Sequence, residues 1–250
     1  MSEGVEAVMS DGHPCLIREV LYAPPAEEEV VALVEVALNF HNSAHYHQAV
    51  QTYIQARELW AREERKLPAE ANIFFHLSIG LVYQSEGEDD LAFAEFMEAL
   101  RYEYDLEEDH PDRALIYSCI AAVHFHRGGY QEALDNFEKA HILREDSLGP
   151  EHVDTALMLH NIGACHMCLG NQTFAVELFR KSLQLFKAQL GSYHPRCLAV
   201  SRNLNKAKSM MLRDFVPDYV PPAPMLQLVP AKKKTGKKGK KKGKKARKRR

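Results

Sequence analysis

The sequence contains no hydrophobic run long enough to cross a membrane, and little cysteine. A membrane-spanning helix needs about 18 or more consecutive apolar residues, and no stretch of the 250 residues comes close. Residues 1–10 also lack a basic region followed by an apolar stretch, so we expect no secretory signal. The five cysteines are odd in number and irregularly spaced, which favours a reducing compartment over a disulfide framework.

Acidic residues are absent from residues 232–250, which contain 11 Lys and 3 Arg. Residues 1–231 therefore hold 18 basic and 34 acidic side chains, and their net charge of −16 stands against +14 in this polybasic segment. Such an asymmetry predicts an interaction tail. We expect its charged residues to bind a polyanion: Lys232, Lys233, Lys234, Lys237, Lys238, Lys240, Lys241, Lys242, Lys244, Lys245, Arg247, Lys248, Arg249 and Arg250.

Aromatic residues are also missing from the polybasic segment, so it cannot stack on nucleic-acid bases. With nothing to bury, we expect it to be disordered, after an extended proline-rich linker at 213–231. A polycation without sequence preference suits the acidic tails of tubulin, the phosphates of nucleic acid, an anionic membrane leaflet or an importin. It could also fold back on the acidic part of the chain, and the sequence leaves these alternatives open.

The middle of the chain, by contrast, repeats itself. His110, His152 and His194 lie 42 residues apart, each between two amphipathic stretches. Self-similarity at such a period is typical of stacked supersecondary units. Four units share an alanine (Ala49, Ala92, Ala133 and Ala175) and, four residues later, an aromatic residue (Tyr53, Phe96, Phe137 and Phe179).

These repeated residues have the chemistry of packed helix pairs. Small residues let two antiparallel helices approach closely, and aromatic residues fill the space between one pair and the next. Glycine at 87, 128 and 170 suits a helix C-terminus. We therefore predict an N-terminal segment at 1–26 and a repeat domain at 27–212, made of helix pairs at about 27–65, 69–106, 110–148 and 152–190 and a polar capping helix at about 195–212.

The pattern of small residue, aromatic, glycine, and then Ala-x-x-x-aromatic-x-x-Ala resembles the tetratricopeptide repeat. The 42-residue period and the Leu190-Gly-x-x-His-Pro195 linker are similar to kinesin light chain repeats. The resemblance implies an all-α, right-handed superhelical solenoid that binds a protein partner in a groove lined by the first helix of each pair. In the repeat register, the groove residues are Glu35, Asn42, Ser78, Ser118, His160, Asn161, Arg202, Asn203 and Lys206.

Two of these groove residues, Asn161 and Asn203, occupy matching places one period apart. In similar repeats, asparagine at this place holds the backbone of a ligand, because its amide donates and accepts at once. The alternative is that both are ordinary polar residues on a wet surface.

The sequence offers no pattern of an active site. Cys165 and Cys168 have the spacing of a zinc or redox pair, but no second pair exists and they fall inside a helical repeat. No phosphate-binding loop or nucleophile elbow is present. We interpret His110, His152 and His194 as capping and packing residues. We expect no catalytic residue, no metal and no cofactor.

These observations predict a non-enzymatic adaptor in the cytoplasm, with a protein partner on the repeats and an anionic polymer on the tail. The resemblance to kinesin light chains, together with the Lys/Gly tail, favours a microtubule-linked setting such as an axoneme or cilium. The alternative is a nuclear or RNA-associated scaffold whose tail is a localisation or nucleic-acid-binding signal.

Overall fold

The computed structural model describes residues 28–63, 67–108 and 110–215. Within these ranges the regular elements are α-helices and one short 3-10 helix, with no strand. No helix in this part of the chain is long and apolar enough to span a bilayer. The predicted N-terminal segment, most of the linker and the polybasic segment lie outside the described residues.

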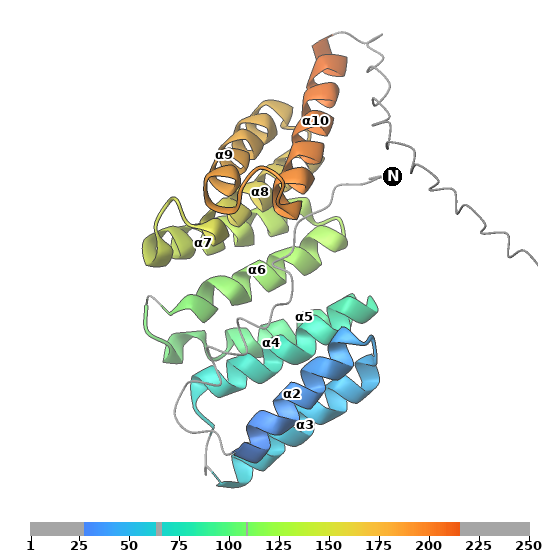
Figure 1. Cartoon of the computed structure of the whole chain (residues 1–250), viewed down its shortest axis with the longest axis vertical. Coiled ribbons are helices and arrows are strands. Elements are labelled where there is room, and N and C mark those ends of the chain that lie inside the picture. Colours follow the sequence, from blue (N-terminus) through green and yellow to red (C-terminus); the bar gives the residue numbers. More distant parts are fainter. Residues whose placement is uncertain (1–27, 64–66, 109, 216–250) are drawn as a thin grey trace, which may run out of the picture.

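The helices form consecutive pairs followed by a single helix (Figure 1), which confirms the predicted all-α solenoid. The most extensive helix contacts lie inside each pair. The pairs are α2 (Glu28–Asn42) with α3 (Tyr46–Glu63), α4 (Ala69–Glu86) with α5 (Asp89–Leu100), α6 (Pro111–His126) with α7 (Tyr130–Leu148), and α8 (Val153–Cys168) with α9 (Gln172–Leu190), followed by α10 (Pro195–Phe215).

Two ends differ from the sequence prediction. Helix α5 stops at Leu100, and the 3-10 helix η1 (Glu103–Asp105) follows it, where the repeat pattern predicts helix to about 106. The cause is the burial of Glu103, whose carboxylate is held by side chains of α6. Helix α10 continues to Phe215, three residues beyond the predicted end.

The turn inside each pair uses the left-handed backbone conformation that the glycines predict. Gly87 caps α4 with φ of 90°, and its N–H reaches back to the carbonyl of Gln84. The first pair has Ala44 at the corresponding place, with φ of 58°. The conformation costs less on glycine than on alanine, because glycine has no Cβ.

Within a pair, the small residue of the first helix lies against the aromatic residue of the second. A Cβ added at Gly80 would lie 2.7 Å from Cδ1 of Phe96, and one added at Gly163 would lie 3.0 Å from Cε1 of Phe179. Both rings are fully buried. The repeated small and aromatic positions therefore mark the closest approach of the two helices.

The three histidines spaced 42 residues apart cap helices, as the sequence predicts. Nδ1 of His110, His152 and His194 accepts a hydrogen bond from the backbone N–H two residues later, at 3.3, 3.1 and 3.2 Å. Each bond satisfies an amide that the first helical turn leaves without a partner. The same N-cap contact therefore begins α6, α8 and α10.

One face of the solenoid is formed by the first helices of the pairs. Helix α4 contacts α6 and α8 contacts α10, whereas contacts of that extent do not join α5 to α7 or α7 to α9. At these two junctions the first helices therefore lie closer together than the second helices, which places α4 with α6, and α8 with α10, on the inner side of the curve. The second helices form the outer side.

Candidate partner-binding face

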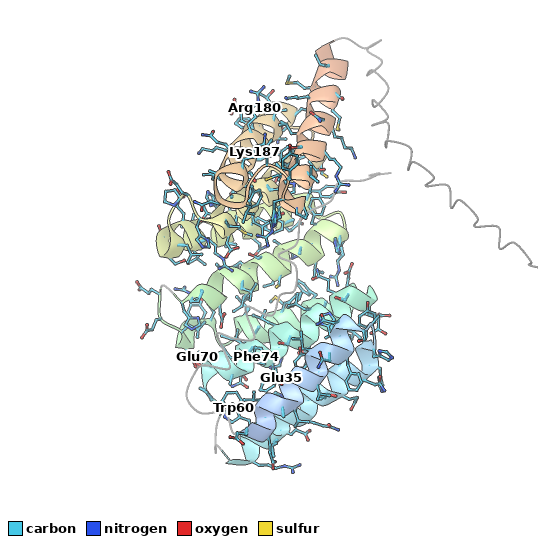
Figure 2. The ribbon with its side chains drawn as sticks, viewed as in Figure 1. Glu35, Trp60, Glu70, Phe74, Arg180 and Lys187 are labelled. Carbon is cyan, nitrogen blue, oxygen red and sulfur yellow. The ribbon has the colours of Figure 1, made fainter. Side chains whose placement is uncertain are left out.

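A row of equivalent positions crosses the inner face, one on each first helix. Glu35, Ser78, Cys119, Asn161 and Asn203 follow one another at spacings of 41–43 residues. Glu35 points into solvent from α2 (Figure 2), and Ser78 is half-buried. The last three members are only 2–3% exposed. Exposure along this row therefore falls from the first pair to the capping helix.

The other predicted groove residues divide in the same way. Asn42 and Arg202 are exposed and Lys206 is half-buried, but Ser118 is 8% and His160 0% exposed. Four of the predicted groove residues, namely Ser118, His160, Asn161 and Asn203, are therefore buried in the fold. The reason is that α8 is enclosed between its neighbours, so that residues 155–165 are all buried.

His160 and Asn203 form a buried polar contact between α8 and α10. Asn203 Nδ2 lies 2.9 Å from His160 Nε2. Burial lowers the pKa of His160 to about 3, so the ring is neutral near pH 7. Because an amide nitrogen only donates, Nε2 accepts and the ring proton sits on Nδ1. The ring of His160 also packs against the ring of Phe179 in an edge-to-face arrangement, with the two centroids 5.3 Å apart.

Two polar atoms beside this contact are buried and have no hydrogen-bond partner in the described residues. They are Nδ1 of His160, a donor, and Oδ1 of its neighbour Asn161, an acceptor. A buried polar atom without a partner costs about 1–3 kcal/mol. Because both residues are buried, these atoms lie inside the fold and are not open to a ligand.

Acid is expected to destabilise the fold through His160. Its pKa is depressed in the folded state, so the stabilising effect is present above the ordinary value of 6.5 and is lost as the pH falls towards about 3. Between pH 7 and pH 5 we expect the free energy of unfolding to fall by about 2 kcal/mol. Urea unfolding at the two pH values measures this loss. In His160→Gln the loss should shrink; an unchanged loss would assign it to other groups.

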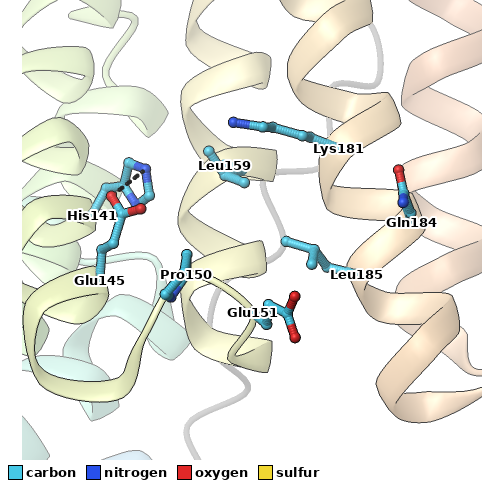
Figure 3. A pocket seen from close by; sticks show the side chains of 8 residues that line it. All are labelled: His141, Glu145, Pro150, Glu151, Leu159, Lys181, Gln184 and Leu185. Carbon is cyan, nitrogen blue, oxygen red and sulfur yellow. Dashed lines mark ion pairs between the residues drawn. The ribbon is translucent and has the colours of Figure 1, made fainter.

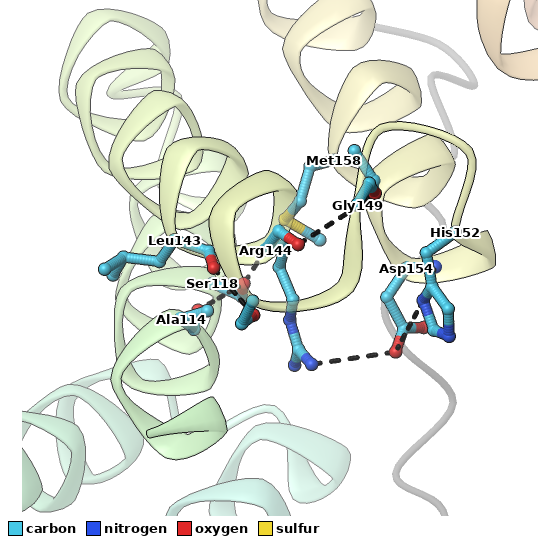
Figure 4. Close-up of polar contacts among 10 residues, drawn as sticks. Ala114, Ser118, Leu143, Arg144, Gly149, His152, Asp154 and Met158 are labelled. Atoms are coloured by element: carbon cyan, nitrogen blue, oxygen red, sulfur yellow. Dashed lines mark hydrogen bonds and ion pairs between the residues drawn. The ribbon is translucent and has the colours of Figure 1, made fainter. Parts of the chain in front are cut away.

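A second polar group lies where α6, α7 and α8 meet (Figure 4). Ser118 Oγ donates to the carbonyl of Ala114 at 2.7 Å and lies 3.4 Å from Sδ of Met158. Arg144 of α7 places Nη1 3.6 Å from Oδ2 of Asp154, and its Nε is buried with no hydrogen bond to a described residue. The hydroxyl of Ser118 is therefore used inside the fold.

Arg144 is a cation that sequence reasoning missed. The repeat register selects residues on first helices, whereas this guanidinium reaches in from the second helix of the third pair. It lies near Cys119, where its charge opposes the effect of burial, which raises the pKa of that thiol to about 12. Nothing in the spacing of the sequence marks the position.

The residues described do not assemble a metal site or a reactive thiol. No group of three or more His, Cys, Asp or Glu in the described ranges could hold a metal ion. Burial raises the pKa of the thiols of both Cys165 and Cys168, so these side chains are protonated and weakly nucleophilic near pH 7. Their position on α8 fits the interpretation of wall residues.

Comparisons with known proteins agree with this geometry. Residues 112–188 match the family model of the tetratricopeptide repeat. Repeats of a Podosopora anserina protein described as a kinesin light chain, whose TPR-like repeats are nearly identical to one another, superpose with a TM-score of 0.62. They share 19% identity with this chain, over 74% of it and 87% of that chain. Residues 112–188 therefore form tetratricopeptide repeats, and the other helix pairs share their fold.

Two further solved structures have the same architecture. BtubC (BKLC) from P. vanneervenii superposes with a TM-score of 0.60 and 16% identity, over 84% of this chain and 95% of that chain. Pseudomonas aeruginosa pilF gives a TM-score of 0.54 and 21% identity, over 77% and 72%. A search of the curated proteins finds no match. The repeats resemble those of kinesin light chains, and tetratricopeptide repeats form a scaffold for protein–protein interaction.

Proposed function

We propose that the protein is a non-enzymatic adaptor whose inner face binds an extended segment of a partner protein. The observation that carries this proposal is the row of side chains along the inner side of α2, where Glu35 and Asn42 are exposed. Their carboxylate and amide are open to a ligand, whereas Asn161 and Asn203 are only 2–3% exposed. An extended segment can therefore form polar contacts at α2 without any rearrangement of the fold.

The same side of α2 also presents apolar surface. Val31, Glu35, Leu38 and Asn42 fall at helical spacing along one side of α2. Val31 and Leu38 are half-buried, whereas Glu35 and Asn42 are exposed. A partner could therefore cover apolar area and form hydrogen bonds along this side of α2.

The test uses two single-alanine variants of the protein as baits in affinity capture from cell extract. Asn42→Ala removes an exposed amide from the inner side of α2, and a bound peptide then loses the hydrogen bond that this amide forms. We expect about a tenfold loss of partner capture at moderate salt, since a hydrogen bond contributes about 1 kcal/mol or more. Asn205→Ala changes an exposed asparagine of α10 and should leave capture unchanged. Equal capture by both variants would contradict the proposal.

The polybasic segment, in our proposal, tethers the complex to an anionic polymer. Its 14 basic residues without any acid support electrostatic binding. The resemblance to kinesin light chain repeats favours the acidic surface of a microtubule, in the cytoplasm and in a cilium or axoneme. A Lys/Arg-rich segment is also the composition of a nuclear localisation or RNA-binding signal, which makes a nuclear scaffold the second candidate.

Deleting residues 232–250 is expected to abolish co-sedimentation with microtubules, because the deletion removes the +14 charge and leaves an acidic chain. The binding of the full chain should weaken steeply with salt. The shortened chain, ending at Ala231, should still capture the groove partner. Unchanged co-sedimentation would contradict the role of the tail. Microtubule binding that is absent from both chains, with a tail-fused reporter in the nucleus, would favour the second candidate.

A further inference from the structure

A cleft lies on the outer side of the solenoid, opposite the inner face. It opens between α7 and α9, the second helices of successive pairs, and α8 forms its floor (Figure 3). Its volume is about 300 Å³, which is enough for one large side chain. The residues that decide its chemistry are His141, Glu145, Glu151, Leu159, Lys181 and Leu185.

The polar lining of this cleft consists mainly of hydrogen-bond acceptors. Glu145 from α7 and Glu151 from the following turn contribute two carboxylates, and Lys181 is the single permanent cation among the lining residues. Lys181 extends from α9 across the cleft towards Leu159 and His141 (Figure 3). The net charge of the lining is therefore negative when His141 is neutral.

His141 adds no positive charge to the lining near pH 7. Burial lowers its pKa, so the ring is neutral near pH 7. Its Nε2 lies 3.7 Å from Oε2 of Glu145. A carboxylate so close favours the ring proton on Nε2, which leaves Nδ1 as a bare acceptor. This Nδ1 is buried and has no hydrogen bond to any residue in the described part of the chain.

The floor of the cleft is apolar. Leu159 is 6% exposed and Leu185 is half-buried beside it. A guest that matches both the floor and the lining has an apolar stem and several donors at its tip. Among side chains, arginine fits best, because its methylenes cover apolar surface while its planar guanidinium binds carboxylates with two parallel bonds. Lysine offers a point charge without that geometry.

We propose that this outer cleft binds an arginine side chain of a second partner protein. The guanidinium lies between the carboxylates of Glu145 and Glu151, and the stem lies on Leu159 and Leu185. Lys181 repels a cationic guest, so charge alone does not favour binding. The site therefore selects a guest that also has an apolar stem and a planar donor group. The site lies on the opposite side of the solenoid from the groove, because its walls come from the second helices α7 and α9.

The neighbouring surface favours another protein over the chain's own polybasic segment as the source of the arginine. Ile142, next to His141 on α7, is 58% exposed. Residues 232–250 contain no large apolar side chain that could cover it. A partner that presents an apolar residue beside its arginine would cover both features at once.

The first test uses the full chain and a small probe, N-acetyl-arginine amide. Methyl resonances of Leu159 and Leu185 are followed by NMR as the probe is raised to about 10 mM, where a millimolar site would be mostly filled. We expect saturable shifts at these two methyl groups. The neutral isostere N-acetyl-citrulline amide should bind more weakly. Shifts with N-acetyl-glutamate amide instead, or no shifts with arginine, would overturn the proposal.

Charge variants of the cleft should change the affinity in opposite directions. Glu145→Gln is expected to weaken arginine binding about two- to fivefold, and Lys181→Gln to strengthen it by a similar factor, which is the range for partly exposed ion pairs. Asp146→Asn is the matched control, since this exposed acid is adjacent on α7 but does not line the cleft. Equal weakening by Glu145→Gln and Asp146→Asn would reduce the effect to general charge and overturn the site.

The source of the arginine is tested by deleting residues 232–250. If another protein supplies it, the affinity of the cleft for N-acetyl-arginine amide should change less than twofold. If deletion raises the affinity about tenfold, the chain's own segment occupies the cleft, and the proposed partner is wrong. This readout does not depend on groove binding or on co-sedimentation.

Discussion

Replacing Phe179 by alanine is expected to lower the free energy of unfolding by about 3–5 kcal/mol. The ring is fully buried, and it lies against the ring of His160 and the bare backbone of Gly163. Helices α8 and α9 approach each other around this ring, so neither can move in to fill the space without losing its other contacts. Most of the cavity should therefore remain, and its cost adds to the lost burial.

The matched control is Phe174→Ala on the same helix. Phe174 is 61% exposed and stacks on His166 with the ring centroids 5.7 Å apart. Truncation there removes little buried area, and we expect a loss below about 1 kcal/mol. Urea unfolding of both variants measures the difference. Similar losses would mean that the fourth pair is not packed as the structure shows.

Hydrogen exchange should show where the loss of Phe179 acts. The stability of a solenoid is approximately a sum of unit and nearest-neighbour terms. Amides of α8, α9 and α10 should therefore exchange faster in Phe179→Ala, whereas those of α2 and α3 should change least. Uniform acceleration along the chain would instead indicate one cooperative unit.

Most of the fold could be predicted from the sequence, because the residues that pack the helices are also the residues that repeat. Gly80 and Gly163 permit the close approach of two helices, and Phe96 and Phe179 occupy it. Their spacing fixes the pairing and its register without knowledge of any distant contact. The histidine caps could be predicted for the same reason, since each acts within its own helical turn.

The exposure of the candidate site could not be predicted, because it depends on how closely successive first helices approach. Glu35 and Asn161 have the same position in the repeat, yet the first is exposed and the second is buried. Periodicity places a residue on a face of its helix and contains no information on the distance to the next pair. Arg144 was missed for a related reason, since it enters from a second helix.

The early end of α5 could not be predicted from the repeat periodicity either. Glu103 falls where the pattern predicts helix, and it is 4% exposed. Its carboxylate contacts residues 10 and 14 positions later in the chain. A tertiary ion pair here outweighs the local preference for helix, and only the packed structure shows it.

Replacing Arg113 by methionine is expected to cost about 3 kcal/mol, because it leaves this carboxylate buried without its counter-ion. Arg113 donates from Nε and Nη2 to Oε1 of Glu103 at 3.2 and 3.1 Å, and its Nη1 donates to the carbonyl of Glu108 at 2.8 Å. Tyr117 donates its hydroxyl to Oε2 of Glu103 at 2.9 Å. Burial and this bond raise the pKa of Tyr117 to about 12, so the phenol remains a donor.

The control for this ion pair is Arg101→Met. Arg101 also contacts a carboxylate, that of Glu98 at 3.0 Å, but its side chain is 73% exposed. An exposed pair contributes about 0–1 kcal/mol, so this variant should be nearly neutral. Urea unfolding of Arg113→Met and Arg101→Met then separates burial from charge pairing. Equal effects would contradict the buried ion pair.

A double variant distinguishes the loss of a favourable pair from the stranding of a charge. In Glu103→Gln with Arg113→Met, the amide oxygen of the glutamine can still accept from Tyr117, and no buried charge remains. We expect the free energy of unfolding of the double variant to lie within about 1 kcal/mol of that of the unsubstituted chain. Adding Glu103→Gln should therefore recover most of the stability that Arg113→Met alone loses. If the double variant is instead less stable than Arg113→Met, the junction between the second and third pairs depends on the ion pair itself. In that case η1 should unfold in both the single and the double variant.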